Sequence, residues 1–247
     1  MKLAVISDVH GNLPAFEAVL TDIDKQHVDL VVNLGDLFSG GVAPGRTADR
    51  MIALNHLVIR GNHERQLLES PPGSLSLSDR LALSQLSQEH LSWMAGLPNS
   101  AEPAEGVLAV HGSPRSDTEY LLETVEPAGA RRASSDEIAE RLGSNLPTQV
   151  LLCGHTHLAR VLKVQSGMMI VNPGSVGWPA YSDHAPYPHV MESGSPHARY
   201  AIIERCGQSW DVTLRLVAYD WDAAAQIALA NGRLDVAASL TTGLVRR

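Results

Sequence analysis

Five short apolar runs along the chain are each followed, within one to three residues, by side chains of the kind that bind metal ions. The runs are residues 3–6, 30–34, 57–59, 107–110 and 150–152, and the polar side chains that follow them are Asp8 and His10, Asp36, Asn62 and His63, His111, and His155 and His157. Short runs of aliphatic and β-branched residues predict buried strands. Polar groups just past the ends of parallel strands converge at one edge of a sheet, where α/β proteins build their sites. The pattern therefore predicts an α/β fold with a polar site at the carboxyl ends of its strands.

The first third of the chain alternates between predicted strands and predicted helices. Strands are predicted at residues 3–7, 29–34 and 56–60, and the helices between them at residues 14–25 and 46–54. Alternation of this kind indicates parallel strands joined by helical crossovers.

The later part of the chain has a different pattern. It is predicted to contain a polar loop at 70–78, a helix at 79–94, a helix beginning near Ser134, strands at 159–165, 168–171, 199–205 and 211–218, and a loop rich in Pro, His, Gly and Ser at 177–198. The short connections between the late strands indicate antiparallel pairing. A helical tail is predicted for residues 220–242, interrupted at Asn231 and Gly232. Since no repeat and no long linker is visible, residues 1–247 are predicted to form one domain.

The composition limits the classes of protein to which this chain can belong. Its formal net charge of −8 argues against a broad nucleic-acid-binding surface. It does not argue against a phosphorylated substrate, because bound cations would supply positive charge locally. The two cysteines, Cys153 and Cys206, lie far apart, which favours a reducing compartment. The run before Asp8 is too short for a signal peptide and no run is long enough to span a bilayer, so a cytoplasmic protein without a membrane partner is expected.

The seven candidate metal ligands combine oxygen and nitrogen donors. They are the oxygens of Asp8, Asp36 and Asn62 and the imidazoles of His10, His111, His155 and His157. A mixed set suits Mn²⁺, Fe or Zn²⁺ better than Ca²⁺ or Mg²⁺, which prefer oxygen alone. Seven protein ligands are too many for one tetrahedral ion, but they fit two ions that share a carboxylate. Two such ions could hold a bridging hydroxide and polarise a phosphoryl group for in-line attack.

In this order, the motifs resemble those of the calcineurin-like metallophosphoesterase superfamily. The pattern of that family is an Asp-x-His, a Gly-Asp, a Gly-Asn-His with an acidic residue, a separate His and a Gly-His-x-His. It is matched here by Asp8 and His10, Gly35 and Asp36, Gly61 to Glu64, His111, and Gly154 to His157. The resemblance extends to about residue 176 and ends with Asn172-Pro173-Gly174-Ser175, which small bacterial members also carry. It implies a two-sheet β-sandwich flanked by helices and the hydrolysis of phosphoesters.

The resemblance also implies which residues hold two divalent metal ions. One ion would be bound by Asp8, His10, Asp36 and His157, and the other by Asp36, Asn62, His111 and His155, so that Asp36 bridges them. Mn²⁺ is the favoured metal, while Fe, Ni²⁺ and Zn²⁺ suit the same ligands. His63 would act beside the leaving-group oxygen as a proton donor or electrostatic stabiliser, and Asn62 would also donate to a phosphate oxygen. Asn12 and Arg115 are expected either to support the metal ligands from behind or to contact the phosphate of the substrate.

One departure from the family pattern narrows the reaction. Protein Ser/Thr phosphatases of this superfamily have a second Asp three residues after the bridging one, and Ser39 occupies that position here. His63 is therefore expected to lack the carboxylate partner that this second Asp would supply. Residues 60–64 do match the protein phosphatases and the symmetrical dinucleoside-tetraphosphate hydrolases. The missing Asp nevertheless favours the small bacterial phosphodiesterase-like branch.

The predicted function is hydrolysis of a phosphodiester in a phosphorylated small molecule or nucleotide. The alternatives are a phosphomonoesterase or protein phosphatase, a dinucleoside polyphosphate hydrolase, and a non-catalytic metal-binding scaffold on the same fold. Taken alone, Asp8, Asp36 and Glu64 could each be a helix cap or turn residue. The remaining histidines, His27, His56, His90, His184, His189 and His197, are expected at the surface, at helix ends or in solvated loops. Trp178 is expected to pack within its loop, and the apolar face of the tail against the core, with a dimer contact as the alternative.

Overall fold

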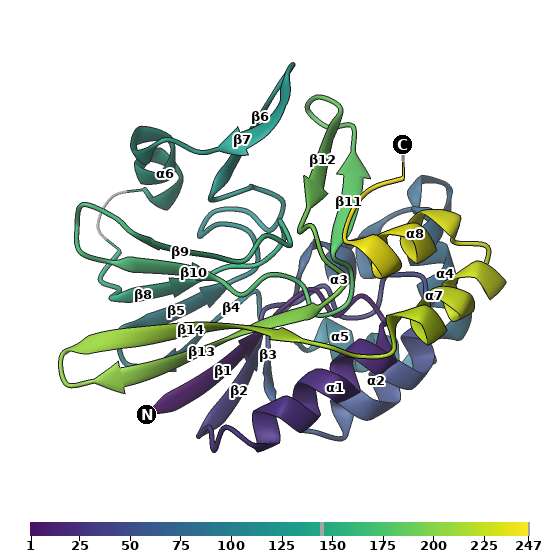
Figure 1. Ribbon diagram of the computed structural model, residues 1–247, viewed down its shortest axis with the longest axis horizontal. Coiled ribbons are helices and arrows are strands. Elements are labelled where there is room, and N and C mark those ends of the chain that lie inside the picture. The colour runs from purple at the N-terminus through teal and green to yellow at the C-terminus, as the bar shows by residue number, and fades with distance from the viewer. Residues whose placement is uncertain (144–145, 247) are drawn as a thin grey trace.

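Two five-stranded sheets lie face to face in the computed structural model, which describes residues 1–143 and 146–246 (Figure 1). The first sheet contains β1 (Lys2–Ile6), β2 (Leu30–Asn33), β3 (Leu57–Val58), β13 (Ala198–Cys206) and β14 (Ser209–Val217), in the order β14-β13-β1-β2-β3. The second contains β4 (Ser100–Ala104), β5 (Val107–Val110), β8 (Val150–Leu152), β9 (Arg160–Lys163) and β10 (Met169–Asn172), in the order β4-β5-β8-β10-β9. The predicted two-sheet α/β architecture is confirmed.

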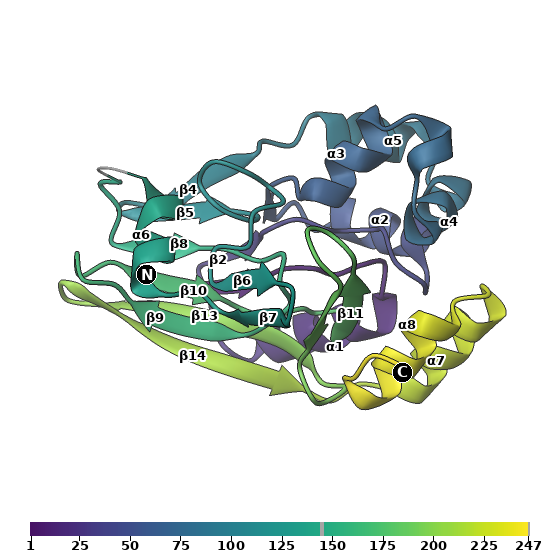
Figure 2. The ribbon, with the colours of Figure 1, turned by 90° about the horizontal axis from the view of Figure 1, so that it is seen from above.

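Helices cover the outer faces of both sheets. α1 (Leu13–Asp24) buries an apolar stripe that includes Phe16 and Ile23 in the same cluster as residues of β1 and β13. α6 (Ser135–Leu142) packs on the second sheet through Ile138. The remaining helices are α2 (Pro44–Ile52), α3 (Asn62–Glu69), a 3₁₀ turn (Pro72–Ser74), α4 (Leu77–Gln85), α5 (Gln88–Ala95), α7 (Trp221–Ala230) and α8 (Leu234–Thr242). These gather at the end of the sheets opposite the amino terminus (Figures 1 and 2).

The parallel strands of both sheets end at the same edge of the sandwich. β1 and β3 each pair in parallel with β2, and β5 and β10 each pair in parallel with β8. Val5 and Val32 from the first sheet and Val150 and Leu152 from the second belong to one buried cluster between the sheets. The turns that follow these strands therefore meet at one edge, as the sequence predicts.

The late strands are antiparallel, as predicted, but they divide between the two sheets. β9 and β10 form an antiparallel pair in the second sheet. The chain then returns to the first sheet, where β13 lies between β1 and β14 and pairs with both in antiparallel fashion. The first sheet therefore pairs β1, near the start of the chain, with β13, which comes about 200 residues later.

Two sequence-based predictions of local structure are wrong. Residues 177–198, predicted as a loop, contain the hairpin of β11 (Ala180–Asp183) and β12 (His189–Glu192), in which Ala180 and Met191 are buried. Their burial supports strands despite a composition rich in turn-forming residues. Residues 79–94, predicted as one helix, form two, because Ser87 accepts a hydrogen bond from the backbone N–H of His90 and caps the second.

A second hairpin and the carboxyl-terminal helices complete the fold. β6 (Glu123–Glu126) pairs with β7 (Gly129–Arg132) beyond the second sheet, a hairpin that the sequence pattern did not indicate. α7 and α8 confirm the predicted helical tail and its break at residues 231–232, where Gly232 has a positive φ of 74°. Their buried residues cluster with Val42 and Trp178. Within the described part of the chain, no helix is both long enough and apolar enough to cross a membrane.

Candidate metal centre

Most of the predicted metal ligands lie in turns with an unusual backbone conformation. Among the described residues, positive φ angles between 49° and 67° occur at seven non-glycine positions, and five of these are Asp8, His10, Asp36, His155 and His157. The left-handed region costs an ordinary residue on the order of 1 kcal/mol or more, so it persists only where the surrounding structure enforces it. Such conformations concentrate at functional sites, and here they turn polar side chains inward at the ends of buried strands.

The first donor set consists of Asp8, His10 and His157, all buried. The two Nε2 atoms lie 3.0 Å apart, and Asp8 Oδ1 lies 3.3 Å from His157 Nε2 and 3.9 Å from His10 Nε2. Each ring directs its Nδ1 at a backbone carbonyl, of Ser39 for His10 and of Trp178 for His157. If each Nδ1 donates its proton there, both Nε2 atoms carry lone pairs. Two lone pairs and the buried Asp8 Oδ1, which lacks a hydrogen-bond partner, therefore face one another, which suits a cation between them.

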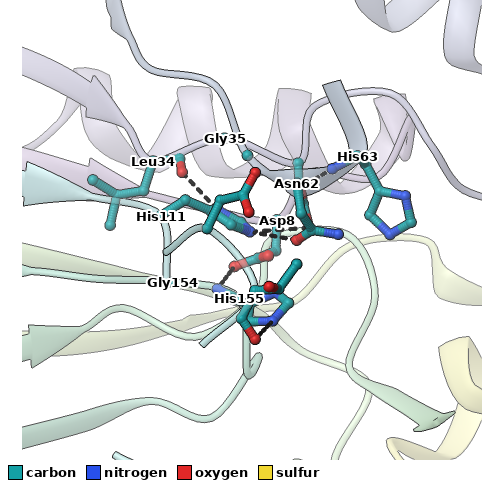
Figure 3. Close-up of polar contacts among 12 residues, drawn as sticks. Asp8, Leu34, Gly35, Asn62, His63, His111, Gly154 and His155 are labelled. Carbon is teal, nitrogen blue, oxygen red and sulfur yellow. Dashed lines mark hydrogen bonds and ion pairs between the residues drawn. The ribbon is translucent and has the colours of Figure 1, made fainter. Parts of the chain in front are cut away.

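The second donor set consists of Asp36, His111 and His155. His111 Nδ1 faces the Leu34 carbonyl at 2.8 Å, so its Nε2 points toward Asn62 Oδ1 at 3.0 Å (Figure 3). The same Nε2 lies 3.2 Å from Asp36 Oδ2. His155 directs Nε2 at the Thr118 carbonyl, 3.2 Å away, which leaves Nδ1 for a ligand. This set again brings acceptors together where a metal ion could bind. It also brings in Asn62, the fourth ligand predicted for this ion.

Asp36 lies between the two sets. Its Oδ2 is 3.2 Å from His111 Nε2 in the second set and 4.0 Å from His10 Nε2 in the first. The carboxylate is 2% exposed, and its other oxygen accepts a hydrogen bond of 3.0 Å from the backbone N–H of His63. This location is compatible with the predicted bridging role of Asp36.

Glu64 holds the turn that carries Asp36. Its carboxylate accepts hydrogen bonds of 2.8 to 2.9 Å from the backbone N–H groups of Asp36, Leu37 and Gly61. Burial and the neighbouring charge of Asp36 raise the pKa of Glu64. A Cβ atom on Gly61 would lie 2.2 Å from Asp36 Oδ1, so only glycine fits at this position. Glu64 therefore caps α3 and positions a candidate ligand at the same time.

Residues at the end of β10 and just after it hold the turns that carry the first and last candidate ligands. Asn172 donates through Nδ2 to the Gly154 carbonyl at 2.8 Å, and Ser175 donates to the Asp8 carbonyl at 2.8 Å. The Asn-Pro-Gly-Ser segment noted in the sequence thus links the first and last ligand turns. It acts through side-chain hydrogen bonds to the backbone carbonyl groups of these turns.

Burial and mutual charge set the protonation of the candidate ligands. Burial, together with the charge of the neighbouring imidazole, lowers the pKa of His10 to about 3 and of His155 to about 4. Burial would also lower the pKa of His111, but the negative charge of Asp36 raises it to about 10. Burial opposes the ionisation of Asp36, yet the charges of His111 and His63 hold its pKa well below the usual range. The negative potential that favours a proton on His111 also attracts a divalent cation.

His63 does have a carboxylate partner, although position 39 does not supply it. Its Nδ1 lies 2.9 Å from Oδ1 of Asp79, a buried residue in the first turn of α4. Ser39 also donates to this carboxylate. Burial would lower the pKa of His63, but the charges of Asp36 and Asp79 and the hydrogen bond to Asp79 raise it to about 9. Asp79 was missed because it lies on a different helix, although its capping-box spacing with Ser76 was visible in the sequence.

A cavity of about 630 Å³ opens above the candidate ligands. Its floor is formed by His10, Asp36, Asn62, His63, His155 and His157. Its walls are formed by Gln66, residues 76–78, Tyr120, Trp178, residues 180–184, Arg233, Asp235, Val245 and Arg246. Asp8 and His111 lie beneath the floor, with side chains that are nearly inaccessible. The wall residues come from regions for which the sequence offered no functional motif.

Asn12 and Arg115, predicted to contact substrate, are not among the residues that line the cavity. Asn12 caps α1 through a hydrogen bond from the Ala15 N–H and donates to the Gly177 carbonyl. Arg115 pairs with Glu119, its Nη2 lying 2.7 Å from Oε1. The geometry gives both residues structural partners, and their contact with substrate stays a prediction.

Aromatic side chains line the cavity, and a histidine from the predicted loop contacts one of them. Trp178 lies edge-on to His10, with ring centroids 5.1 Å apart, besides accepting from His157 through its carbonyl. His189, expected to be solvated, is 5% exposed and lies 3.0 Å from the Tyr120 hydroxyl through Nε2. Tyr181 donates in turn to Tyr120 at 2.9 Å. This network ties the β11–β12 hairpin to the wall of the cavity.

Comparison with known proteins identifies the family. The sequence model of the calcineurin-like phosphoesterase superfamily domain matches residues 1–192. The chain belongs to this superfamily, and it is accordingly a metal-dependent phosphoester hydrolase. The uncharacterized protein MJ0912 of Methanocaldococcus jannaschii is 25% identical over 203 residues, which cover 72% of this chain and 76% of that protein. Phosphodiesterase YfcE of Escherichia coli is 36% identical over 77 residues, which cover 27% of this chain and 42% of that protein.

Solved structures agree with this assignment over nearly the whole chain. A metallophosphoesterase from Sphaerobacter thermophilus is 28% identical, with a TM-score of 0.75 and coverage of 98% of this chain and 99% of that one. The hypothetical protein PH1004 from Pyrococcus horikoshii, 18% identical with a TM-score of 0.76 over 98% of each chain, shares the fold. The architecture therefore extends beyond residue 192 to include the late strands and the helical tail.

Proposed function

We propose that this chain is a phosphodiesterase that works with two divalent metal ions bound at the floor of the cavity. The observation that carries the proposal is the presence of two adjacent donor sets in which acceptor atoms face one another, with Asp36 between them. Such sets are stabilised by cations. When bound, the two ions would polarise the phosphoryl oxygens and lower the pKa of the attacking water.

The proposed ligands follow the sequence prediction. Asp8, His10, Asp36 and His157 would hold one ion, and Asp36, Asn62, His111 and His155 would hold the other. Mn²⁺ is the proposed metal because the carboxylate and amide oxygens suit it, although Fe, Ni²⁺ and Zn²⁺, which imidazole suits, accept the same set. The backbone carbonyls behind His10, His111 and His157 orient their rings before any ion binds.

His63 and Asn62 are proposed to act on the substrate itself. His63 lines the cavity with its side chain 19% exposed, and the contact of Nδ1 with Asp79 leaves Nε2 for the leaving oxygen. Protonation of that oxygen as its bond to phosphorus breaks would lower the barrier. The Asn62 amide nitrogen is turned away from His111, toward the side of His63 (Figure 3). It can therefore donate to a phosphoryl oxygen while Oδ1 faces the metal.

The size and lining of the cavity favour a diester over a small monoester. A volume of about 630 Å³ has room for groups on both sides of a phosphate. Trp178 and Tyr181 offer aromatic surfaces in its walls, and Arg246 offers a positive charge. These features suit a phosphorylated small molecule or nucleotide. The partial similarity to phosphodiesterase YfcE points the same way.

The test compares bis(p-nitrophenyl) phosphate with p-nitrophenyl phosphate as substrates. Metal-stripped protein is reloaded with Mn²⁺, and the Asp36→Asn variant is the blank. Faster hydrolysis of the diester, lost in the variant, is the expected outcome. If the monoester is hydrolysed faster, the protein is a phosphomonoesterase. If neither ester is hydrolysed although two ions are bound, a dinucleoside polyphosphate is the indicated substrate. If neither ester is hydrolysed and no ion is bound, a non-catalytic scaffold protein is favoured.

A further inference from the structure

A buried carboxylate on α4 contacts the proposed proton donor. Asp79 is 2% exposed, and its Oδ1 lies 2.9 Å from His63 Nδ1. The same carboxylate accepts hydrogen bonds from the hydroxyl of Ser39 and from the backbone N–H and hydroxyl of Ser76. Four donors thus converge on one side chain. A carboxylate held in this way has a fixed place, and it can fix the group that it contacts.

The contact with Asp79 determines how the ring of His63 is presented to the cavity. A histidine ring can turn about its bond to Cβ and can offer either nitrogen to a ligand. A carboxylate at Nδ1 selects the orientation in which Nδ1–H points at Asp79 and Nε2 points away from it. His63 lies beside the floor, with its ring centroid 5.4 Å from that of His10. The nitrogen opposite Asp79 is therefore the one available to a substrate.

Asp79 occupies a position from which it can contact His63 although position 39 carries no acidic residue. Ser39 occupies that position, is fully buried, and donates its hydroxyl proton to Asp79. Asp79 reaches the site because it lies in the first turn of α4, where its bonds to Ser76 also cap the helix. A carboxylate from a helix thus stands next to a hydroxyl from the turn that follows β2. Together the two residues occupy the space behind His63.

We propose that Asp79 is the positioning residue of His63. It supplies, from α4, the carboxylate that is missing at position 39, and Ser39 donates a hydrogen bond to it. This inference depends on the proposed function, because it assigns Asp79 a role in the step that His63 assists. Asp79 does not touch the reacting atoms. Its effect is to hold His63 Nε2 at the oxygen of the departing group.

The predicted effect depends on the leaving group. A phenol that departs readily as the anion gains little from protonation, whereas a poor leaving group depends on it. In Asp79→Asn, kcat is expected to fall roughly ten- to a hundred-fold more for a phenyl diester than for a p-nitrophenyl diester, since general acid catalysis contributes roughly 10²–10⁴-fold. Metal content should not change, because Asp79 contacts His63, which is not a proposed metal ligand, and none of the proposed ligands directly.

A second His–Asp pair in the molecule provides the matched control. His90 Nε2 lies 3.0 Å from Asp49 Oδ1, and neither residue lines the cavity. Asp49→Asn removes one negative charge from a His–Asp pair outside the cavity, and it should leave both rates unchanged. The double variant Ser39→Asp with Asp79→Ser moves the carboxylate to the turn after β2. It should recover part of the rate on the phenyl diester.

The experiment combines steady-state kinetics on aryl methyl phosphodiesters with proton NMR of the Zn²⁺-loaded full chain. A downfield ring N–H resonance, assigned through its loss in His63→Gln, should be present in the parent protein and absent in Asp79→Asn. If that resonance is missing from the parent, the proposed contact is wrong. If it is present but Asp79→Asn slows both diesters equally, Asp79 serves only to cap α4. A parent protein that hydrolyses no phosphoester at all would overturn the proposed function itself, an outcome separate from these two.

Discussion

The floor of the cavity comes from turns that follow parallel strands and from the first residues of α3, whereas its walls come from helices, loops, a hairpin and the last residues of the described chain. Floor residues are mostly buried and held by backbone partners, as His10 and His157 are by carbonyl groups. Wall residues such as His184 and Arg246 are exposed. The comparison separates two tasks. The floor determines what reaction is possible, and the walls determine which molecule can reach it.

The largest expected effect is at the centre of the floor. Asp36→Asn removes the charge shared by both donor sets, so at least one ion should be lost and kcat should fall by roughly 10³-fold or more, because metal ions supply several kcal/mol of transition-state stabilisation. Metal analysis after dialysis and diester hydrolysis would measure both effects. Asp29→Asn, which changes an exposed carboxylate at the far end of the first sheet, is the control. Unchanged metal content would contradict the bridging role.

A methyl group added at Gly61, beneath the floor, should weaken metal binding by displacing Asp36. In Gly61→Ala the new Cβ would lie 2.2 Å from Asp36 Oδ1 and 2.5 Å from Asp36 N, so the carboxylate must shift. Metal affinity should fall roughly ten- to a hundred-fold, as it does when groups that orient ligands are disturbed. Competition with a chelator would measure it. Gly73→Ala, where the Cβ would meet nothing within 4 Å, should bind metal like the parent protein.

His63→Ala tests the part of the floor that binds no metal. The rate on a poor leaving group should fall roughly 10²–10⁴-fold, with metal content retained. A series of diesters with leaving groups of increasing basicity would measure the dependence. Full turnover on the poorest leaving group would show that His63 has no part in its departure.

The smallest expected effect is in the wall. Arg246→Ala removes an exposed positive charge at the cavity, and an exposed ion pair contributes on the order of 1 kcal/mol or less. For an anionic substrate KM should rise roughly two- to five-fold while kcat stays the same. Arg132→Ala removes an exposed charge on β7 that does not line the cavity, and it is the control. An equal change in kcat would place Arg246 in the chemistry of the floor and weaken the distinction between floor and walls.

The sequence could predict the floor because each of its ligand turns is local. His155 and His157, for example, follow a recognisable strand within a few residues, and the strand itself fixes their place. Asp79 could not be assigned in the same way, because its contact with His63 depends on the angle at which α4 meets α3. His189 was expected to be solvated because its segment is rich in turn-forming residues. Its burial results from contact with Tyr120, 69 residues away in the sequence.

The placement of β13 between β1 and β14 bears on how the protein is made. Until residues 198–206 leave the ribosome, β1 has an unpaired edge, and the first sheet cannot close. Each proposed ion also takes ligands from both halves of the polypeptide. His157 is synthesised long after Asp8 and His10, and His155 long after Asp36 and His111. Neither half can assemble a complete ion site during translation. Metal loading must therefore follow synthesis of most of the chain, and a nascent fragment depends on its surroundings to keep the exposed strand edge from pairing elsewhere.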